Sequence, residues 1–167
     1  MGSVAWLFAV LLDYRDLSSL RTGATIGSRE QVQTLVDLGV TEICNVYGLT
    51  EAYGNSCVID GKLPLERRLV SSGAPLDGVE IKIADFETGV SLPMGEMGEV
   101  RVRGSNLMRG YWCAVSKVAT EGLNDGWFHT GDMGFLDAQG CLQIVGRNKD
   151  MIISGGENIS SIEVEKA

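Results

Sequence analysis

The chain contains two neighbouring stretches that decide its fold, Asp125-Gly-Trp-Phe-His-Thr-Gly-Asp132 and Ile144-Val-Gly-Arg-Asn-Lys-Asp-Met-Ile-Ile-Ser-Gly-Gly-Glu-Asn158. Between them, apolar runs flank a tight connection at residues 137–140, a pattern that predicts a β-hairpin. A hairpin of this size returns the chain to its starting point, so Asp132 and Arg147 are expected to face one cavity. A carboxylate holds a sugar diol and a guanidinium holds a phosphate or ribose oxygen, so the pair indicates a nucleotide site. The alternative is an ordinary surface ion pair.

Upstream of this hairpin, two segments alternate apolar and polar residues with the period of a half-buried strand. These are residues 79–84 and residues 98–104, and a turn at 85–89 follows the first. The sequence therefore predicts a largely antiparallel β structure over residues 79–145, with Asp132 and Arg147 open to the same side as Thr50. We interpret the charged face of the second strand as a solvated face. That face carries Glu99, Arg101 and Arg103.

Two segments around this region have weaker patterns. Residues 56–75 contain basic interruptions and no clear period, which indicates a loop. Residues 107–112 end in Tyr111 and Trp112, and we expect these aromatic rings to pack on the sheet.

The N-terminal third of the chain predicts a βαβ unit. Residues 16–28 indicate a buried strand that ends in a glycine-rich loop, and Ser28 with Gln31 forms a capping box at the start of a helix. Gly39 ends this helix, and a second strand follows at residues 40–46. Ligands gather at the carboxyl ends of such strands, where Gly23–Thr25 and Tyr47–Glu51 are expected to lie.

Composition limits the classes of partner. The chain has 167 residues and a net charge of −8 with no basic stripe, which argues against nucleic acid as a partner. Its 4 cysteines form no C-x-x-C pair, so neither a zinc site nor a disulfide framework is indicated, and a reducing, cytoplasmic location is expected.

Both ends of the chain carry weak helical signals. Residues 4–12 are apolar, but they lack a basic segment before them and are too short to span a bilayer, so a buried helix is expected there. Residues 161–166 resemble the first turns of another helix.

An ordered set of motifs resembles the adenylate-forming, AMP-binding enzymes, and within them the acyl-CoA synthetase branch. The motifs are Tyr47-Gly-Leu-Thr-Glu51, Arg103-Gly-Ser-Asn-Leu-Met-Arg-Gly-Tyr-Trp112, Gly126–Asp132 and Gly146–Ile159. The resemblance implies an incomplete α/β fold. Residues 1–55 would end an α/β subdomain, residues 56–147 would form a mostly antiparallel β subdomain, and residues 148–167 would begin a small C-terminal domain.

The resemblance also implies roles for individual residues. Tyr47 would stack on adenine, Thr50 would bind the α-phosphate, and Glu51 would ligate Mg²⁺. Asp132 would hold the ribose hydroxyls, Arg147 the ribose or phosphate, and Lys149 would be the hinge of a rotating small domain. His129 is interpreted as structural rather than as a general base. Other expected lining residues are Gly23, Ala24, Thr25, Asn45 and Gly48 around the adenine and acyl pocket, and Gly155 and Gly156 along the pantetheine channel of CoA.

The implied parent reaction joins a carboxylic acid, such as a fatty acid, to ATP and then transfers the acyl group to CoA. The family's phosphate-binding loop and its C-terminal lysine have no counterpart in these residues, so the chain is expected to be a slice of a longer ligase, inactive by itself and prone to self-association. The alternative is a non-catalytic remnant that binds adenine nucleotide weakly or acts as an interaction module.

Overall fold

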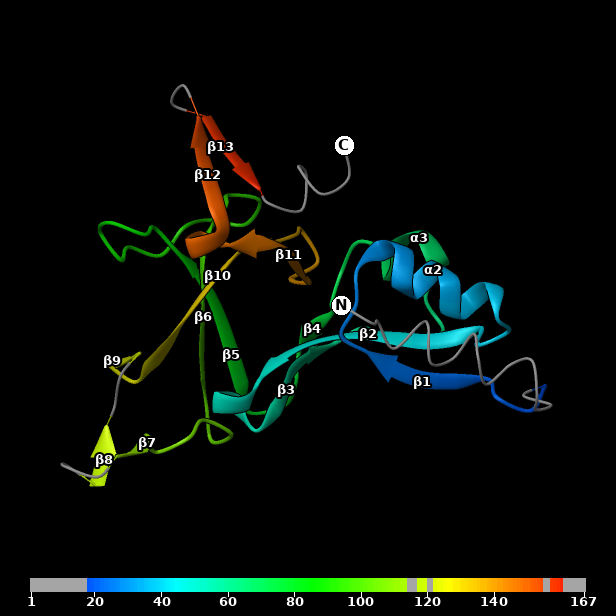
Figure 1. Ribbon diagram of the computed structural model, residues 1–167, viewed down its shortest axis with the longest axis horizontal. Coiled ribbons are helices and arrows are strands. Elements are labelled where there is room, and N and C mark those ends of the chain that lie inside the picture. The colour runs from blue at the N-terminus through cyan, green and yellow to red at the C-terminus, as the bar shows by residue number, and fades with distance from the viewer. Residues whose placement is uncertain (1–17, 114–116, 120–121, 155–156, 161–167) are drawn as a thin grey trace.

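The computed structural model describes residues 18–113, 117–119, 122–154 and 157–160 of the chain. Figure 1 shows the two larger sheets, which lie next to each other, with the short helices α2 and α3 on one side of the first sheet. The first sheet has the strand order β1-β2-β3-β4, and the second has the order β11-β10-β6-β5 with β9 added to β10. The mixed α/β architecture and the antiparallel second sheet agree with the sequence prediction. The division into three predicted parts, residues 1–55, 56–147 and 148–167, remains a prediction.

The first sheet begins with the predicted βαβ unit. Strand β1 (Thr22–Thr25) pairs in parallel with β2 (Glu42–Leu49), and α2 (Arg29–Asp37) connects them. Ser28 accepts a hydrogen bond from the backbone of Gln31 while the Gln31 side chain accepts one from the backbone of Ser28, which confirms the capping box. The apolar face of α2 then packs on β2, with Val32 fully buried. Strand β1 was expected to be buried, but it forms the edge of the sheet and three of its four residues are exposed.

The segment predicted to be a loop over residues 56–75 is in fact structured. It contains strand β3 (Gly54–Val58), the helical turn α3 (Leu65–Arg68) and the short strand β4 (Ala74–Pro75), all joined to the first sheet. Buried Arg68 holds this segment in place, because its Nε and Nη1 donate to the carbonyl oxygens of Leu63 and Ile43. Arg68 is one of the basic residues that led to the prediction of a loop, and its hydrogen bonds help to order the segment.

The second sheet confirms the prediction for residues 79–145. It consists of β5 (Val79–Ala84), β6 (Gly98–Gly104), β9 (Leu123–Asn124), β10 (Trp127–Leu136) and β11 (Leu142–Arg147), and every pairing is antiparallel. The connection between β10 and β11 is the expected tight turn, in which the Asp137 carboxylate accepts hydrogen bonds from the backbones of Gln139 and Cys141.

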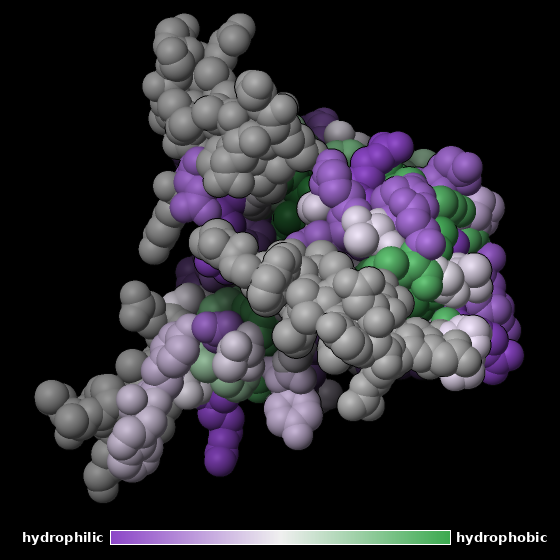
Figure 2. All heavy atoms as spheres, turned by 45° about the vertical axis from the view of Figure 1, so that its right-hand side comes forward, coloured by the Kyte–Doolittle hydropathy of each residue, from purple (hydrophilic) through white to green (hydrophobic). Residues whose placement is uncertain are grey.

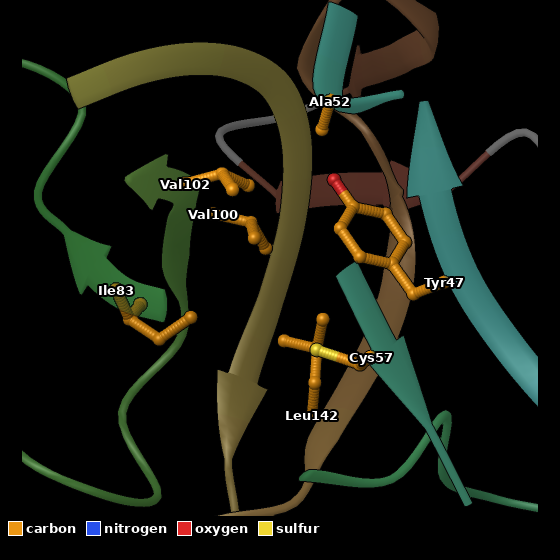
Figure 3. Packing of buried hydrophobic residues seen from close by; sticks show 7 residues of the cluster. All are labelled: Tyr47, Ala52, Cys57, Ile83, Val100, Val102 and Leu142. Atoms are coloured by element: carbon orange, nitrogen blue, oxygen red, sulfur yellow. The ribbon is translucent and has the colours of Figure 1, made fainter. Parts of the chain in front are cut away.

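A shared hydrophobic core joins the two sheets. Figure 3 shows its side chains converging from both sheets, and they are Tyr47, Ala52, Cys57, Ile83, Val100, Val102 and Leu142. Because β2 and β3 supply one wall and β5, β6 and the start of β11 supply the other, burial of these side chains fixes how the two sheets meet. The candidate nucleotide residues lie beside this junction.

Two further predictions about exposure are wrong. Glu99 and Arg101 were assigned to a solvated face, yet each residue is only 8% exposed. The aromatic rings of Tyr111 and Trp112 were expected to pack on the sheet, yet they are 42% and 79% exposed. Both residues lie in β7 (Tyr111–Cys113), which pairs with β8 (Lys117–Ala119) instead of joining the second sheet.

The chain continues from β11 through the short 3-10 turn Asn148–Asp150 into a separate hairpin. Strand β12 (Met151–Ser154) pairs with β13 (Glu157–Ser160), and the hairpin extends beyond the end of β11 in Figure 1. The predictions for residues 4–12 and 161–166 lie outside the described residues. No helix in the described part of the chain is long and apolar enough to cross a membrane.

Candidate nucleotide site

Asp132 and Arg147 meet as the sequence predicted. They are directly opposite each other in the β10–β11 pair, and Nε of Arg147 donates to Oδ1 of Asp132 at 2.8 Å. The aspartate side chain is 10% exposed, whereas the arginine side chain is 65% exposed. The hydrogen bond from Arg147 to Asp132, together with the charge of this carboxylate, raises the pKa of the guanidinium. The pair therefore places a buried carboxylate beneath a solvent-facing cation.

Tyr47 completes this arrangement from the other sheet. Its hydroxyl donates to Oδ2 of Asp132 at 2.7 Å, so the two oxygens of the carboxylate have different donors. Burial and the charge of Asp132 both raise the pKa of Tyr47 well above its ordinary value, which keeps the proton on the phenol. The sequence did not predict this hydrogen bond, because its partners are 85 positions apart and only the junction of the two sheets brings them together.

A cavity of about 390 Å³ opens beside this triad, between the first sheet and β11. It brings together five residues predicted to contact the nucleotide, which are Asn45, Tyr47, Gly48, Asp132 and Arg147. The Asn45 side chain is positioned through its Oδ1, which accepts a hydrogen bond from the backbone of Gly27 at 3.4 Å. Figure 3 shows the Tyr47 ring lying among the core side chains, with its hydroxyl pointing away from Cys57. Stacking of this ring on adenine remains a prediction.

The other three residues predicted for this region line a different cavity. Gly23, Ala24 and Thr25 border an apolar space of about 200 Å³ between β1 and α2. Ile26 and Gln31 line both this space and the cavity that contains Tyr47. The two cavities are therefore neighbours, but Gly23, Ala24 and Thr25 do not line the cavity that contains Tyr47.

Glu51 faces a third cavity, of about 690 Å³, that also contains Asp132 and Arg147. The backbone of Met108 donates to the Glu51 carbonyl at 2.7 Å, and the Tyr111 hydroxyl donates to its carboxylate. Thr50 begins the same 3-10 turn (Thr50–Ala52) and is exposed, outside the residues that line this cavity.

No group of three or more metal-ligating side chains occurs within the described ranges. The chemistry of Glu51 still fits Mg²⁺, because this ion is commonly held by one or two carboxylates together with phosphate oxygens of the substrate. Glu51 is half-buried at the edge of a large polar cavity, so its carboxylate is the group in this turn that would hold such an ion.

A buried charged cluster next to Glu51 was missed by the sequence analysis. Oε2 of Glu99 lies 2.8 Å from Nε of Arg101 and 3.3 Å from Nδ1 of His129. His129 and Glu99 also line the cavity that contains Glu51, and the structural role predicted for His129 remains a prediction. Alternation along β6 shows that Glu99 and Arg101 share a face, but sequence alone does not show that the neighbouring strand β10 places His129 beside Glu99.

Three predicted site residues lie partly or wholly outside the part of the chain that the structure describes. The backbone of Lys149 belongs to the 3-10 turn Asn148–Asp150, at the connection between β11 and the β12–β13 hairpin, but its side chain is not described. Gly155 and Gly156 lie outside the described residues. Their predicted roles at the hinge and along the CoA channel therefore remain predictions.

Comparison with known proteins identifies the family. A family model described as "AMP-binding enzyme" matches residues 4–112. The chain belongs to the AMP-binding enzyme family. Feruloyl-CoA synthase from Amycolatopsis sp is 41% identical over 154 residues, covering 90% of this chain and 30% of the relative. Mouse mitochondrial medium-chain acyl-CoA ligase ACSF2 is 38% identical over 157 residues, covering 90% of this chain and 25% of the relative.

Solved structures support the same assignment. O-succinylbenzoate CoA synthetase from Bacillus subtilis, solved with its acyl-adenylate intermediate, gives a TM-score of 0.77 at 32% identity and covers 96% of this chain and 33% of that structure. ATP-bound MatB from Rhodopseudomonas palustris gives a TM-score of 0.71 at 32% identity, over 87% of this chain and 28% of that structure. The chain is homologous to acyl-CoA ligases and spans about a third or less of the length of these relatives.

Proposed function

We propose that these residues form the ribose- and phosphate-facing part of an ATP-dependent acid–CoA ligase. The parent reaction would join a carboxylic acid to ATP, release pyrophosphate, and transfer the acyl group from the adenylate to CoA. The observation that carries this proposal is the Asp132 carboxylate, held by Tyr47 and Arg147 at the boundary of two cavities. A buried acceptor of this kind suits the 2′- and 3′-hydroxyls of a ribonucleotide.

The other predicted site residues would bind the phosphate side of the nucleotide or move the small domain. Thr50 and Glu51 lie on the turn after β2, where Thr50 would contact the α-phosphate and Glu51 would hold Mg²⁺. Arg147 would neutralise charge on the nucleotide, and Lys149 would act at the hinge of the small domain. Catalysis at such a site depends mainly on positioning and charge stabilisation around the phosphates. A fatty acid substrate and a cytoplasmic location are further parts of the proposal.

The 167-residue chain supplies the ribose, α-phosphate and adenine sides of the proposed site, so we expect it to bind AMP weakly without forming an adenylate. Ligand-observed NMR titration with AMP, alongside a pyrophosphate-release assay with acetate, medium-chain and aromatic acids, tests both parts. GMP is a control for recognition of the base. Absence of AMP binding would contradict the proposed site, and pyrophosphate release by this chain would show that adenylation needs nothing beyond these residues.

A non-catalytic module that binds adenine nucleotide is the second candidate, since the same contacts bind AMP without any turnover. A chimera separates the two functions. Residues 18–160 would replace the matching stretch of B. subtilis o-succinylbenzoate CoA synthetase, to which the chain is 32% identical. Retained ligase activity would support the ligase proposal. A folded chimera that binds AMP but releases no pyrophosphate would favour the non-catalytic module.

A further inference from the structure

The Asp132 carboxylate is held by two donors whose surroundings differ greatly. Tyr47 is 6% exposed and belongs to the core that joins the sheets, whereas the Arg147 side chain is 65% exposed. In the pair with Arg147 only the carboxylate is buried, so solvent screens the guanidinium and its long side chain keeps much of its freedom. A buried hydrogen bond to a charged acceptor is stronger and fixes the acceptor in one orientation. The orientation of Asp132 is therefore set mainly by Tyr47.

Asp132 lies at the boundary of the two cavities, so its orientation decides what a ligand meets there. Its side chain lines both the cavity of about 390 Å³ and the cavity of about 690 Å³. A carboxylate offers about four lone-pair positions, of which Tyr47 and Arg147 use one each. The positions that remain can accept hydrogen bonds from two neighbouring hydroxyls only if the carboxylate plane is fixed.

We propose that Tyr47 is a positioning residue whose hydroxyl orients the Asp132 carboxylate for the 2′,3′-diol of a ribonucleotide. This inference rests on the proposed nucleotide site and assigns the phenol oxygen a role separate from any stacking by the ring. Because burial and the charge of Asp132 raise the pKa of Tyr47, the phenol keeps the proton that it donates to the carboxylate. The hydroxyl thus contributes to recognition of the sugar without contacting the ligand.

The test measures the binding of two ligands to two variants, each of which lacks one tyrosine hydroxyl. Tyr47→Phe removes only the hydroxyl, and Tyr53→Phe is the matched control because Tyr53 is 92% exposed on the neighbouring turn. AMP carries the diol and 2′,3′-dideoxy-AMP lacks it. We expect Tyr47→Phe to weaken AMP binding by about tenfold, the typical effect of losing a hydrogen bond to a charged group, and to leave dideoxy-AMP binding unchanged. Tyr53→Phe should change neither affinity.

Three other outcomes would contradict the positioning role of Tyr47, and one of them would also contradict the proposed nucleotide site. If Tyr47→Phe weakens both ligands equally, the residue acts by stacking or packing alone, and the positioning role is wrong while the nucleotide site stands. If the unmodified chain binds AMP and dideoxy-AMP equally, Asp132 does not recognise the diol and the positioning role is also wrong. If it binds neither ligand, the proposed function fails, and the positioning role fails with it.

A second measurement covers the case in which Tyr47→Phe does not fold. The chain labelled with 3-fluorotyrosine has 4 tyrosines, and Phe variants of the other three assign the Tyr47 ¹⁹F resonance by elimination. This resonance should shift more with AMP than with dideoxy-AMP, because only AMP adds hydrogen bonds to the carboxylate that the phenol contacts. Equal shifts with the two ligands would overturn the positioning role.

Discussion

Glu99 and Arg101 form a buried ion pair on β6, with Nε of Arg101 2.8 Å from Oε2 of Glu99 and both side chains 10% exposed. Arg103 on the same strand pairs with Glu80, but those side chains are 45% and 58% exposed. The two arginines lie on one face of one strand, so they provide a matched comparison of burial.

Replacing Arg101 with alanine should destabilise the fold strongly. The change leaves the Glu99 carboxylate buried without its arginine, and breaking such a pair typically costs about 3–5 kcal/mol. Arg103→Ala removes an exposed pair and a contact with the Trp127 ring, so its effect on the free energy of unfolding should be small. Urea denaturation of both variants checks this expectation, and similar midpoints would contradict it.

The contrast between these two arginines shows what the sequence predicts and what it does not. The strands of the second sheet and the meeting of Asp132 with Arg147 follow from local patterns, because alternation and tight turns determine a hairpin within a few residues. Glu99 on β6 contacts His129 on β10, and Tyr47 on β2 contacts Asp132 on β10, so both contacts depend on which strands and sheets meet. Such contacts join residues far apart in the sequence, and no local pattern encodes them.

Gly48 should be essential for the pairing of β2 with β3. A Cβ at this position would lie 1.5 Å from the Gly54 carbonyl oxygen, a backbone atom that cannot move without breaking the strand pair. Gly48→Ala should therefore lower the free energy of unfolding by about 1–3 kcal/mol or more, since this is the usual cost of overpacking. Gly23→Ala is the control, because its Cβ would meet only Ile43 Cδ1 at 3.5 Å. Equal unfolding midpoints for the two variants would argue against this packing.

Cys57 should resist thiol reagents in the folded chain. Its side chain is fully buried, and burial together with the neighbouring Cys141 raises the pKa of the thiol to about 12. A raised pKa means that the folded state holds the proton more tightly than the unfolded state. The resulting stability is complete below the unfolded pKa of about 8.5 and is lost as the pH rises toward the folded value.

Two variants that each retain a single cysteine test this protection. A chain that retains only Cys57 should react slowly with Ellman's reagent at pH 8, and urea should restore its reactivity. A chain that retains only the partly exposed Cys44 should react readily without urea. Rapid labelling of Cys57 under native conditions would show that the junction of the sheets opens more easily than its burial indicates.

Asp132→Ala is the variant that bears most directly on the proposed site. It removes the acceptor for the ribose diol and also leaves the buried Tyr47 hydroxyl without its partner. We expect weaker AMP binding together with a loss of about 1–3 kcal/mol in the free energy of unfolding, the typical penalty for an unsatisfied buried polar group. Calorimetric titration with AMP and urea denaturation measure the two effects separately.

Asp132→Asn separates affinity from stability at the same position. The asparagine side chain retains an oxygen that can accept from Tyr47, so most of the lost stability should return. It carries no charge for Arg147 and offers fewer lone pairs to the diol, so AMP binding should remain weaker than in the unmodified chain. Unchanged AMP affinity in both variants would remove Asp132 from the site. Weakened affinity that returns fully with asparagine would mean that Asp132 acts through the fold rather than through the ribose.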